Sequence, residues 1–189
     1  MRFAPVLGLV AVFWLVFLIN NLLLGGRLSS HGIVPRHPSS LTGVLWAPFL
    51  HESFGHLLAN TLPFLILGGI VCARSSTQFG LVTVVGVLLG GGLTWVFARS
   101  ASHIGASGLI FCYFGYLVSR AYFERSILTL LLSLACIIAY GGMLKGIVPT
   151  STHVSWESHL TGLIAGGVAA WLSSLPRSAE SFEKQELRP

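Results

Sequence analysis

The sequence predicts an all-α membrane protein, folded as a bundle of six transmembrane helices. Hydrophobic residues make up 53% of the 189-residue chain and charged residues only 9%, and the mean hydropathy is +0.80. Soluble domains carry about 25% charged residues. The apolar residues form separate blocks of helix-spanning length instead of the alternation of barrel strands, which favours helices. These blocks take up the length of the chain, so we expect no soluble domain beside the membrane domain.

The six apolar blocks are separated by short segments rich in glycine, proline, serine or charged residues. The first block is too long for the core of a signal peptide and lacks a small-x-small cleavage site, so we interpret it as a span. The predicted spans cover residues 4–24, 55–73, 79–97, 107–120, 126–141 and 156–175. Residues 1–175 thus form one membrane domain, and the polar residues 176–189 are expected to be a disordered cytoplasmic tail.

The longest connection, residues 27–54, contains Pro35, Pro38 and Pro48, which exclude a regular helix there. Its apolar second half is expected to lie in the membrane interface, with Trp46 as an anchor. In the span that follows, Pro63 is expected to kink the helix or to begin its regular part.

The net charge of +5 comes from Lys and Arg residues scattered between the apolar blocks. Such cations mark membrane edges and set topology, so we expect the lipid bilayer and no nucleic acid as a partner. With the N-terminus inside, seven cations fall on the inner side and four on the outer side, which favours two cytoplasmic termini. The inner set is Arg2, Arg74, Arg120, Arg125, Arg177, Lys184 and Arg188, and the outer set is Arg27, Arg36, Arg99 and Lys145.

In this orientation three polar sites fall at the outer ends of the even-numbered spans. His56 and Asn60 lie in the first turns of the second span, Ser107 opens the fourth, and His159 lies in the first turn of the sixth. Polar groups inside spans cost free energy and usually face the bundle interior or a water-filled cavity. Their common depth therefore predicts one functional site.

Spacing directs these side chains toward one another. His56 and Asn60 are one helical turn apart and share a face, as do His159, Gly162 and Gly166. Glycines at four-residue spacing let a second helix approach closely. Two such helices can bring Ser107 and His159 within hydrogen-bond reach, which a serine nucleophile requires because its hydroxyl is weak at neutral pH.

Three segments in this order, HESFGHLLAN at 51–60, GASG at 105–108 and SHLTGLIAG at 158–166, resemble the rhomboid family of intramembrane serine proteases. The resemblance implies Ser107 as nucleophile and His159 as general base and then general acid. It implies an oxyanion site from His56, the Asn60 amide and the Ser107 backbone N–H, and substrate-site candidates at Gly105 and Phe111. Phe111 is expected to pack on the His159 ring. No cofactor and no metal are implied.

The resemblance also implies the substrates: single-pass membrane proteins, cleaved at small residues near the outer end of the transmembrane segment. It implies entry past the fifth span and the loop 144–155, where Gly141 and Gly142 are expected to add flexibility, and a bacterial inner membrane. The chain departs from the family pattern at Ser158, usually Ala, and at Phe111, often Tyr. The Trp-Arg pair of some bacterial members is also missing from the first long connection.

The carboxylates favour a dyad over a triad, since the chain has no Asp and only Glu52, Glu124 and Glu157 lie outside the tail. Glu157 diverges from His159 by about 200° on a helix, so we expect a solvated residue at the loop edge. His51 is expected to bond loop backbone. His31, His37, His103 and His153 are interpreted as loop residues without a catalytic role.

Three rival functions share single features with this sequence. An intramembrane zinc protease needs His-Glu-x-x-His, but the histidine after His51-Glu52 comes one residue too late and is rotated by about 140°. The α/β-hydrolase turn Gly-x-Ser-x-Gly fails because Leu109 takes the place of its last glycine. The remaining alternative is a catalytically silent rhomboid-like protein that binds or sorts membrane clients. Such a protein is expected to lack Ser107 or His159.

Overall fold

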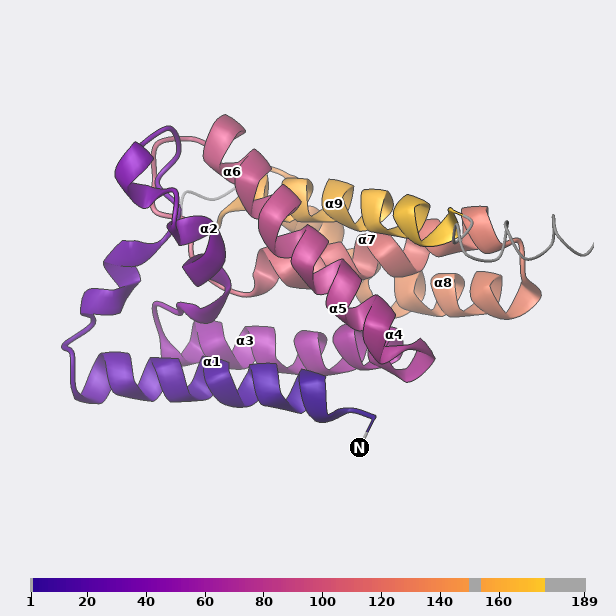
Figure 1. The fold of residues 1–189 in the computed structure, drawn as a ribbon, viewed down its shortest axis with the longest axis horizontal. Coiled ribbons are helices and arrows are strands. Elements are labelled where there is room, and N and C mark those ends of the chain that lie inside the picture. Colours follow the sequence, from indigo (N-terminus) through magenta and orange to yellow (C-terminus); the bar gives the residue numbers. More distant parts are fainter. Residues whose placement is uncertain (1, 150–153, 176–189) are drawn as a thin grey trace, which may run out of the picture.

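The computed structural model describes residues 2–149 and 154–175, and its regular structure is helical throughout (Figure 1). Within these residues the only β-type contact is an isolated bridge between Ile33 and His103. The α-helices are α1 (Ala4–Leu22), α2 (Gly43–Trp46), α3 (Phe54–Pro63), α4 (Gly69–Arg74), α5 (Ser76–Val85), α6 (Gly91–Phe97), α7 (Ser107–Glu124), α8 (Ile127–Tyr140) and α9 (Trp156–Ser174). This confirms the all-α class.

Two of the long helices contain a wide turn at their middle. α3 and α4 are joined by the π-helical segment η4 (Phe64–Gly68), and α5 and α6 by η5 (Gly86–Gly90). η4 begins directly after Pro63, which has no backbone N–H and crowds the preceding turn. Pro63 therefore lies within a continuous helix as a local irregularity.

Among the described residues, four segments are long and apolar enough to cross a membrane: Ala4–Leu22, Phe54–Arg74, Ser76–Phe97 and Ile127–Ile147. The last includes η6 (Gly141–Ile147), a 3-10 continuation of α8. α7 and α9 are of similar length and run beside them (Figure 1). Both are less apolar than these four segments. They form the most extensive helix contact of the bundle, and helices covered by other helices need fewer lipid-facing apolar residues.

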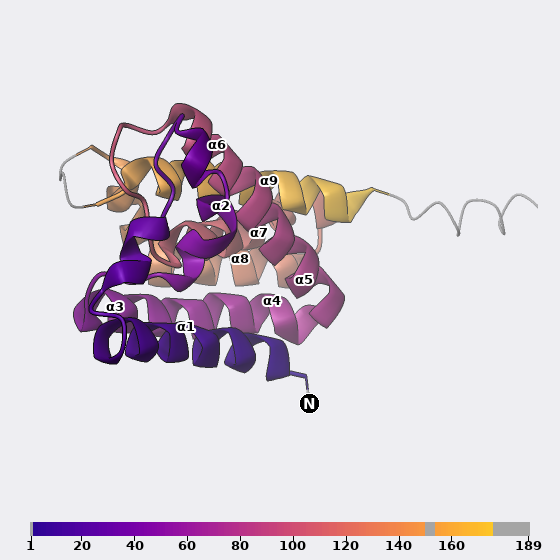
Figure 2. The same ribbon diagram turned by 60° about the vertical axis from the view of Figure 1, so that its left-hand side comes forward.

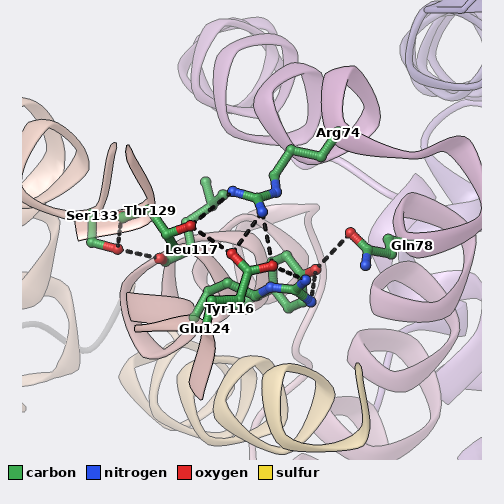
Figure 3. A network of polar contacts seen from close by, with 8 residues as sticks. Arg74, Gln78, Tyr116, Leu117, Glu124, Thr129 and Ser133 are labelled. Atoms are coloured by element: carbon green, nitrogen blue, oxygen red, sulfur yellow. Dashed lines mark hydrogen bonds and ion pairs between the residues drawn. The ribbon is translucent and has the colours of Figure 1, made fainter. Parts of the chain in front are cut away.

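α7 is longer than predicted and ends at Glu124 instead of near residue 120. Arg120, expected as a cation at the membrane edge, is buried and pairs with Glu124 one turn further along α7. Arg74 also pairs with Glu124, and Thr129 of α8 donates to the same carboxylate at 2.5 Å. These contacts form a polar network that joins α4, α7 and α8 (Figure 3).

The network extends to one further helix, α5, and includes a second contact between α7 and α8. The Arg120 guanidinium donates to Tyr116 Oη, which donates to Gln78 of α5 at 3.1 Å. Ser133 of α8 donates to the Leu117 carbonyl of α7 at 2.7 Å (Figure 3). A buried charge is tolerated when it is paired and hydrogen-bonded. The prediction that this helix ends near residue 120 is therefore wrong. It treated Arg120 as solvated, whereas the side chain is buried and paired, and α7 continues to Glu124.

The connection between α1 and α3 is a chain of short turns and helices. It contains η1 (Arg27–His31), η2 (Pro38–Ser40), α2 and η3 (Ala47–Phe49), and Trp46 is 55% exposed, as an interface anchor would be. This connection lies at one end of the bundle, and the start of α1 and the end of α9 lie at the opposite end (Figures 1 and 2). The predicted tail, residues 176–189, and His153 lie outside the described residues.

Candidate active site

Glycines bring the starts of α7 and α9 into backbone contact. A Cβ added to Gly162 would overlap the Gly108 carbonyl group, and one added to Gly166 would overlap the Cys112 carbonyl oxygen. A Cβ at Gly108 would lie 3.2 Å from the Ser158 carbonyl oxygen. The two helices are therefore as close as glycine permits at the turns that carry the candidate serine and histidine.

The structure places Ser107 and His159 in direct contact. Ser107 Oγ lies 2.8 Å from His159 Nε2, and His159 Nδ1 lies 2.9 Å from the carbonyl oxygen of Gly146 in η6. Because a carbonyl oxygen can only accept, Nδ1 carries a proton and donates to it. In the neutral ring Nε2 is then the acceptor for the Ser107 hydroxyl, which is the tautomer that a general base needs.

Phe111 of α7 stacks on the His159 ring. The ring centroids are 4.3 Å apart and the planes differ by 9°. The expected packing between these two rings is present. Phe111 contacts the face of the imidazole, and the Gly146 carbonyl binds Nδ1 at its edge. Two contacts thus orient the ring without a carboxylate.

His56 and Asn60 face the same space from α3. The Asn60 amide donates to the His56 carbonyl oxygen at 2.9 Å, and the His56 backbone N–H donates to Ser53 Oγ at 3.1 Å, which caps the helix. His56, Asn60, Ser107 and His159 all line one cavity of about 390 Å³. The four side chains that the sequence analysis grouped are therefore brought together.

Gly105 packs closely against the His56 ring and offers no free donor. Its φ of +111° is a conformation that residues with a Cβ rarely adopt, and a Cβ here would lie 2.6 Å from His56 Nε2. Its N–H donates to the Ala47 carbonyl oxygen at 2.8 Å. Ser107, by contrast, is the first residue of α7, where backbone N–H groups have no partner within the helix.

Glu157 is not the solvated residue that we expected. It is 6% exposed, accepts the Arg99 backbone N–H at 3.2 Å and forms an ion pair with the Arg99 guanidinium at 3.5 Å. It therefore faces the loop before α7, where Arg99 is its partner. The described residues contain no group of three or more side chains placed to hold a metal ion.

His51 packs among rings, and its contact with loop backbone is limited to Phe49. It is 2% exposed, lies 5.2 Å from the His56 ring and 5.7 Å from the Phe13 ring, and neither ring nitrogen has a hydrogen-bond partner of normal geometry in the described residues. Burial first, and then the nearby His56 ring, lowers the pKa of His51 to about 4, although the backbone contact with Phe49 raises it. His51 is therefore an uncharged support for His56 at neutral pH.

Two contributors to the site were missed by the sequence analysis. The first is the Gly146 carbonyl, which every residue type has, so the sequence does not show that this one binds His159. His103, interpreted as a plain loop residue, is 2% exposed and lines the cavity. Its position two residues before Gly105 was the only hint in the sequence.

The fold and the contact between Ser107 and His159 define an integral helical membrane protein with a serine–histidine pair at the starts of two packed helices. The family model of the Rhomboid domain matches residues 38–176. The chain belongs to the rhomboid family.

Three similar proteins come from mycobacteria. Uncharacterized protein Mb1372 of Mycobacterium bovis and uncharacterized protein Rv1337 of Mycobacterium tuberculosis are each 38% identical, over 97% of this chain and 80% of their own length. Uncharacterized protein ML1171 of Mycobacterium leprae is 36% identical, over 90% of this chain and 71% of its own. The likeness therefore extends over nearly the whole chain.

Proposed function

We propose that this protein is an intramembrane serine endopeptidase that cleaves transmembrane segments with a Ser107–His159 dyad. The observation that carries the proposal is the 2.8 Å contact between Ser107 Oγ and His159 Nε2, with Nδ1 held by the Gly146 carbonyl. A serine becomes a useful nucleophile when an adjacent base can take its proton. Family membership supports the same chemistry.

The reaction follows from this geometry in two halves. Ser107 Oγ attacks the peptide carbonyl carbon while its proton passes to His159 Nε2, and the carbonyl electron pair moves onto oxygen. The tetrahedral intermediate collapses, the C–N bond breaks, and Nε2 returns the proton to the leaving amine. Water then attacks the acyl-serine, gives its proton to Nε2, and Ser107 Oγ leaves with that proton.

The negative oxygen of the intermediate needs donors beside Ser107. The Ser107 backbone N–H at the start of α7, the Asn60 amide and the His56 ring line the same cavity and are the proposed donors. The positive end of the α7 dipole adds to them. Each such donor is typically worth about 10²–10³ in rate.

We further propose that the cavity opens to the outer side of a bacterial plasma membrane and that both termini are cytoplasmic. The start of α1 and the end of α9 lie at the bundle end away from α2, and α3, α7 and α9 all begin at the α2 end (Figure 1). The excess of cations on the proposed inner side supports this orientation. The proposed substrates are single-pass membrane proteins cut near the outer end of their span.

The test compares purified wild type with Ser107→Ala in detergent and in liposomes. Wild type is expected to cleave a single-pass substrate and to be labelled by a fluorophosphonate at Ser107, whereas Ser107→Ala does neither. Cleavage that survives in Ser107→Ala, or labelling at another residue, contradicts the proposal. A wild type that binds the substrate but neither cleaves it nor reacts with the probe supports the silent, client-binding alternative instead.

Gly146→Ala is expected to lower the cleavage rate about 10²-fold, since a misplacement of about 1 Å in a catalytic group has an effect of that size. A Cβ at Gly146 would lie 2.9 Å from His159 Nδ1 and 3.3 Å from the Phe111 ring, so it pushes directly on the base. Gly80→Ala is the control for the same change in a helix away from the site, because a Cβ there meets nothing within 4 Å. Equal rates for the two variants would show that η6 does not orient His159.

A further inference from the structure

A group of polar residues outside the dyad joins the loop before α7 to the start of α9. At its centre His103 Nε2 donates to the Arg99 carbonyl oxygen at 3.0 Å, and His103 Nδ1 lies 2.5 Å from Ser155 Oγ. Ser155 Oγ is in turn hydrogen-bonded to Ser158 Oγ at 2.6 Å. Ser158 directly precedes His159, so the chain of contacts ends beside the base.

The backbone of His103 is fixed from the other side by the long connection. Its N–H donates to the Ile33 carbonyl oxygen at 2.9 Å, and its carbonyl oxygen accepts the Ile33 N–H at 3.0 Å. Gly32 permits this approach, because a Cβ there would lie 2.8 Å from the His103 carbonyl oxygen. His103 is therefore held between two loops and can act as a rigid support.

The ionisation of His103 suits this position. Burial lowers its pKa, while the Arg99 carbonyl and the Glu157 carboxylate raise it and the Arg99 guanidinium lowers it. At neutral pH the ring is uncharged, and the Arg99 carbonyl oxygen requires its single proton on Nε2. The ring is thus fixed in one tautomer, with Nδ1 facing the Ser155 hydroxyl.

A second set of contacts joins the same two segments. The Arg99 N–H donates to Glu157 Oε1 at 3.2 Å, and the Arg99 guanidinium donates to the Val154 carbonyl oxygen at 2.8 Å. Contacts from Arg99 and His103 therefore reach the four residues Val154, Ser155, Glu157 and Ser158 at the start of α9. The loop that carries these contacts runs directly into Ser107.

We propose that His103 is a positioning residue, which sets the distance between Ser107 and His159 by fixing the start of α9 to the loop that leads into α7. This role rests on the proposed protease function and deepens it. His103 acts through Ser155 and Ser158 and takes no part in proton transfer. The backbone of His103 binds the long connection, and its side chain joins the loop before α7 to the residues that lead into α9.

The test measures kcat and KM separately for His103→Leu, together with the rate of fluorophosphonate labelling of Ser107. Leucine fills the site but removes the two hydrogen bonds of the His103 ring, to the Arg99 carbonyl and to the Ser155 hydroxyl. We expect kcat and labelling to fall about 10–100-fold, the range for a small misplacement of catalytic groups, with KM changed by less than about twofold. His103→Gln, whose amide can donate to the Arg99 carbonyl, is expected to recover part of the rate.

Two controls separate positioning from a loss of folding. His37→Leu makes the same change at an exposed histidine of the long connection and is expected to match wild type. Ser133→Ala removes a buried hydrogen bond far along the bundle, to the Leu117 carbonyl, and reports what destabilisation alone does. Hydrogen exchange in His103→Leu is expected to rise at residues 154–159 and not across the bundle.

The experiment separates a failure of the positioning role of His103 from a failure of the proposed protease function. If wild type neither cleaves nor labels, the protease proposal fails and this role with it. If wild type is active and His103→Leu keeps its kcat, the positioning role alone is refuted. The positioning role is also refuted if His103→Leu loses activity only in proportion to the fraction of unfolded protein, as is expected for Ser133→Ala.

Discussion

His159→Ala is expected to lower the rate of substrate cleavage by about 10³–10⁶-fold, the range seen when one member of a serine–histidine unit is removed. The imidazole is the only described base in hydrogen-bond contact with Ser107 Oγ. Without it the serine proton has no acceptor at 2.8 Å, and the leaving amine has no acid. The measurement is the initial rate of cleavage of a single-pass substrate in liposomes.

The double variant Ser107→Ala/His159→Ala sharpens this expectation. Residues that act as a unit are not additive, so the double variant should be no slower than the slower single one. His31→Ala, at an exposed histidine of the long connection, is the control and should cleave at the wild-type rate. Additive losses from Ser107→Ala and His159→Ala would mean that the two residues act independently.

Gly166→Ala is expected to have the largest effect on folding, a loss of about 1–3 kcal/mol or more of unfolding free energy from overpacking. Its Cβ would overlap the Cys112 carbonyl oxygen and lie 2.6 Å from the Tyr116 nitrogen. Both are backbone atoms of α7 and cannot turn away, so α7 and α9 must separate. Thermal unfolding in detergent measures the loss, and cleavage should fall because the separation also moves His159 from Ser107.

The adjacent glycine supplies the control for that variant. A Cβ at Gly167 would lie 3.6 Å from Ser119 Oγ, an ordinary contact distance. Gly167→Ala is therefore expected to unfold at the wild-type temperature or slightly above it, because alanine is the better helix former. If both variants unfold alike, helix propensity and not the close approach decides the stability at these positions.

Much of the fold could be predicted because a bilayer restricts what a chain can do. Long apolar blocks in lipid must satisfy their own backbone groups, so each block predicts a helix. The starts of α1, α7 and α9 lie where they were expected. The exceptions are informative: Arg120 continues α7 because Glu124 and Tyr116 supply partners that composition alone does not reveal.

The candidate site was predictable where side chains carry the chemistry, as at Ser107, His159, His56 and Asn60. It was not predictable where backbone or loop packing contributes. The Gly146 carbonyl is orienting only because η6 folds back over His159, and Glu157 is buried because Arg99 comes from a loop 58 residues away. Such long-range partners are absent from any local pattern.

The polar network around Glu124 has a consequence for how the chain enters the membrane. In the proposed orientation Arg74 and Arg120 first act as separate positive charges that retain their ends of the nascent spans in the cytoplasm. After assembly both guanidinium groups bind one carboxylate between helices. On this proposal the same residues first direct insertion and later hold the inserted helices together, and a substitution that keeps the topology but removes an ion pair is expected to weaken assembly.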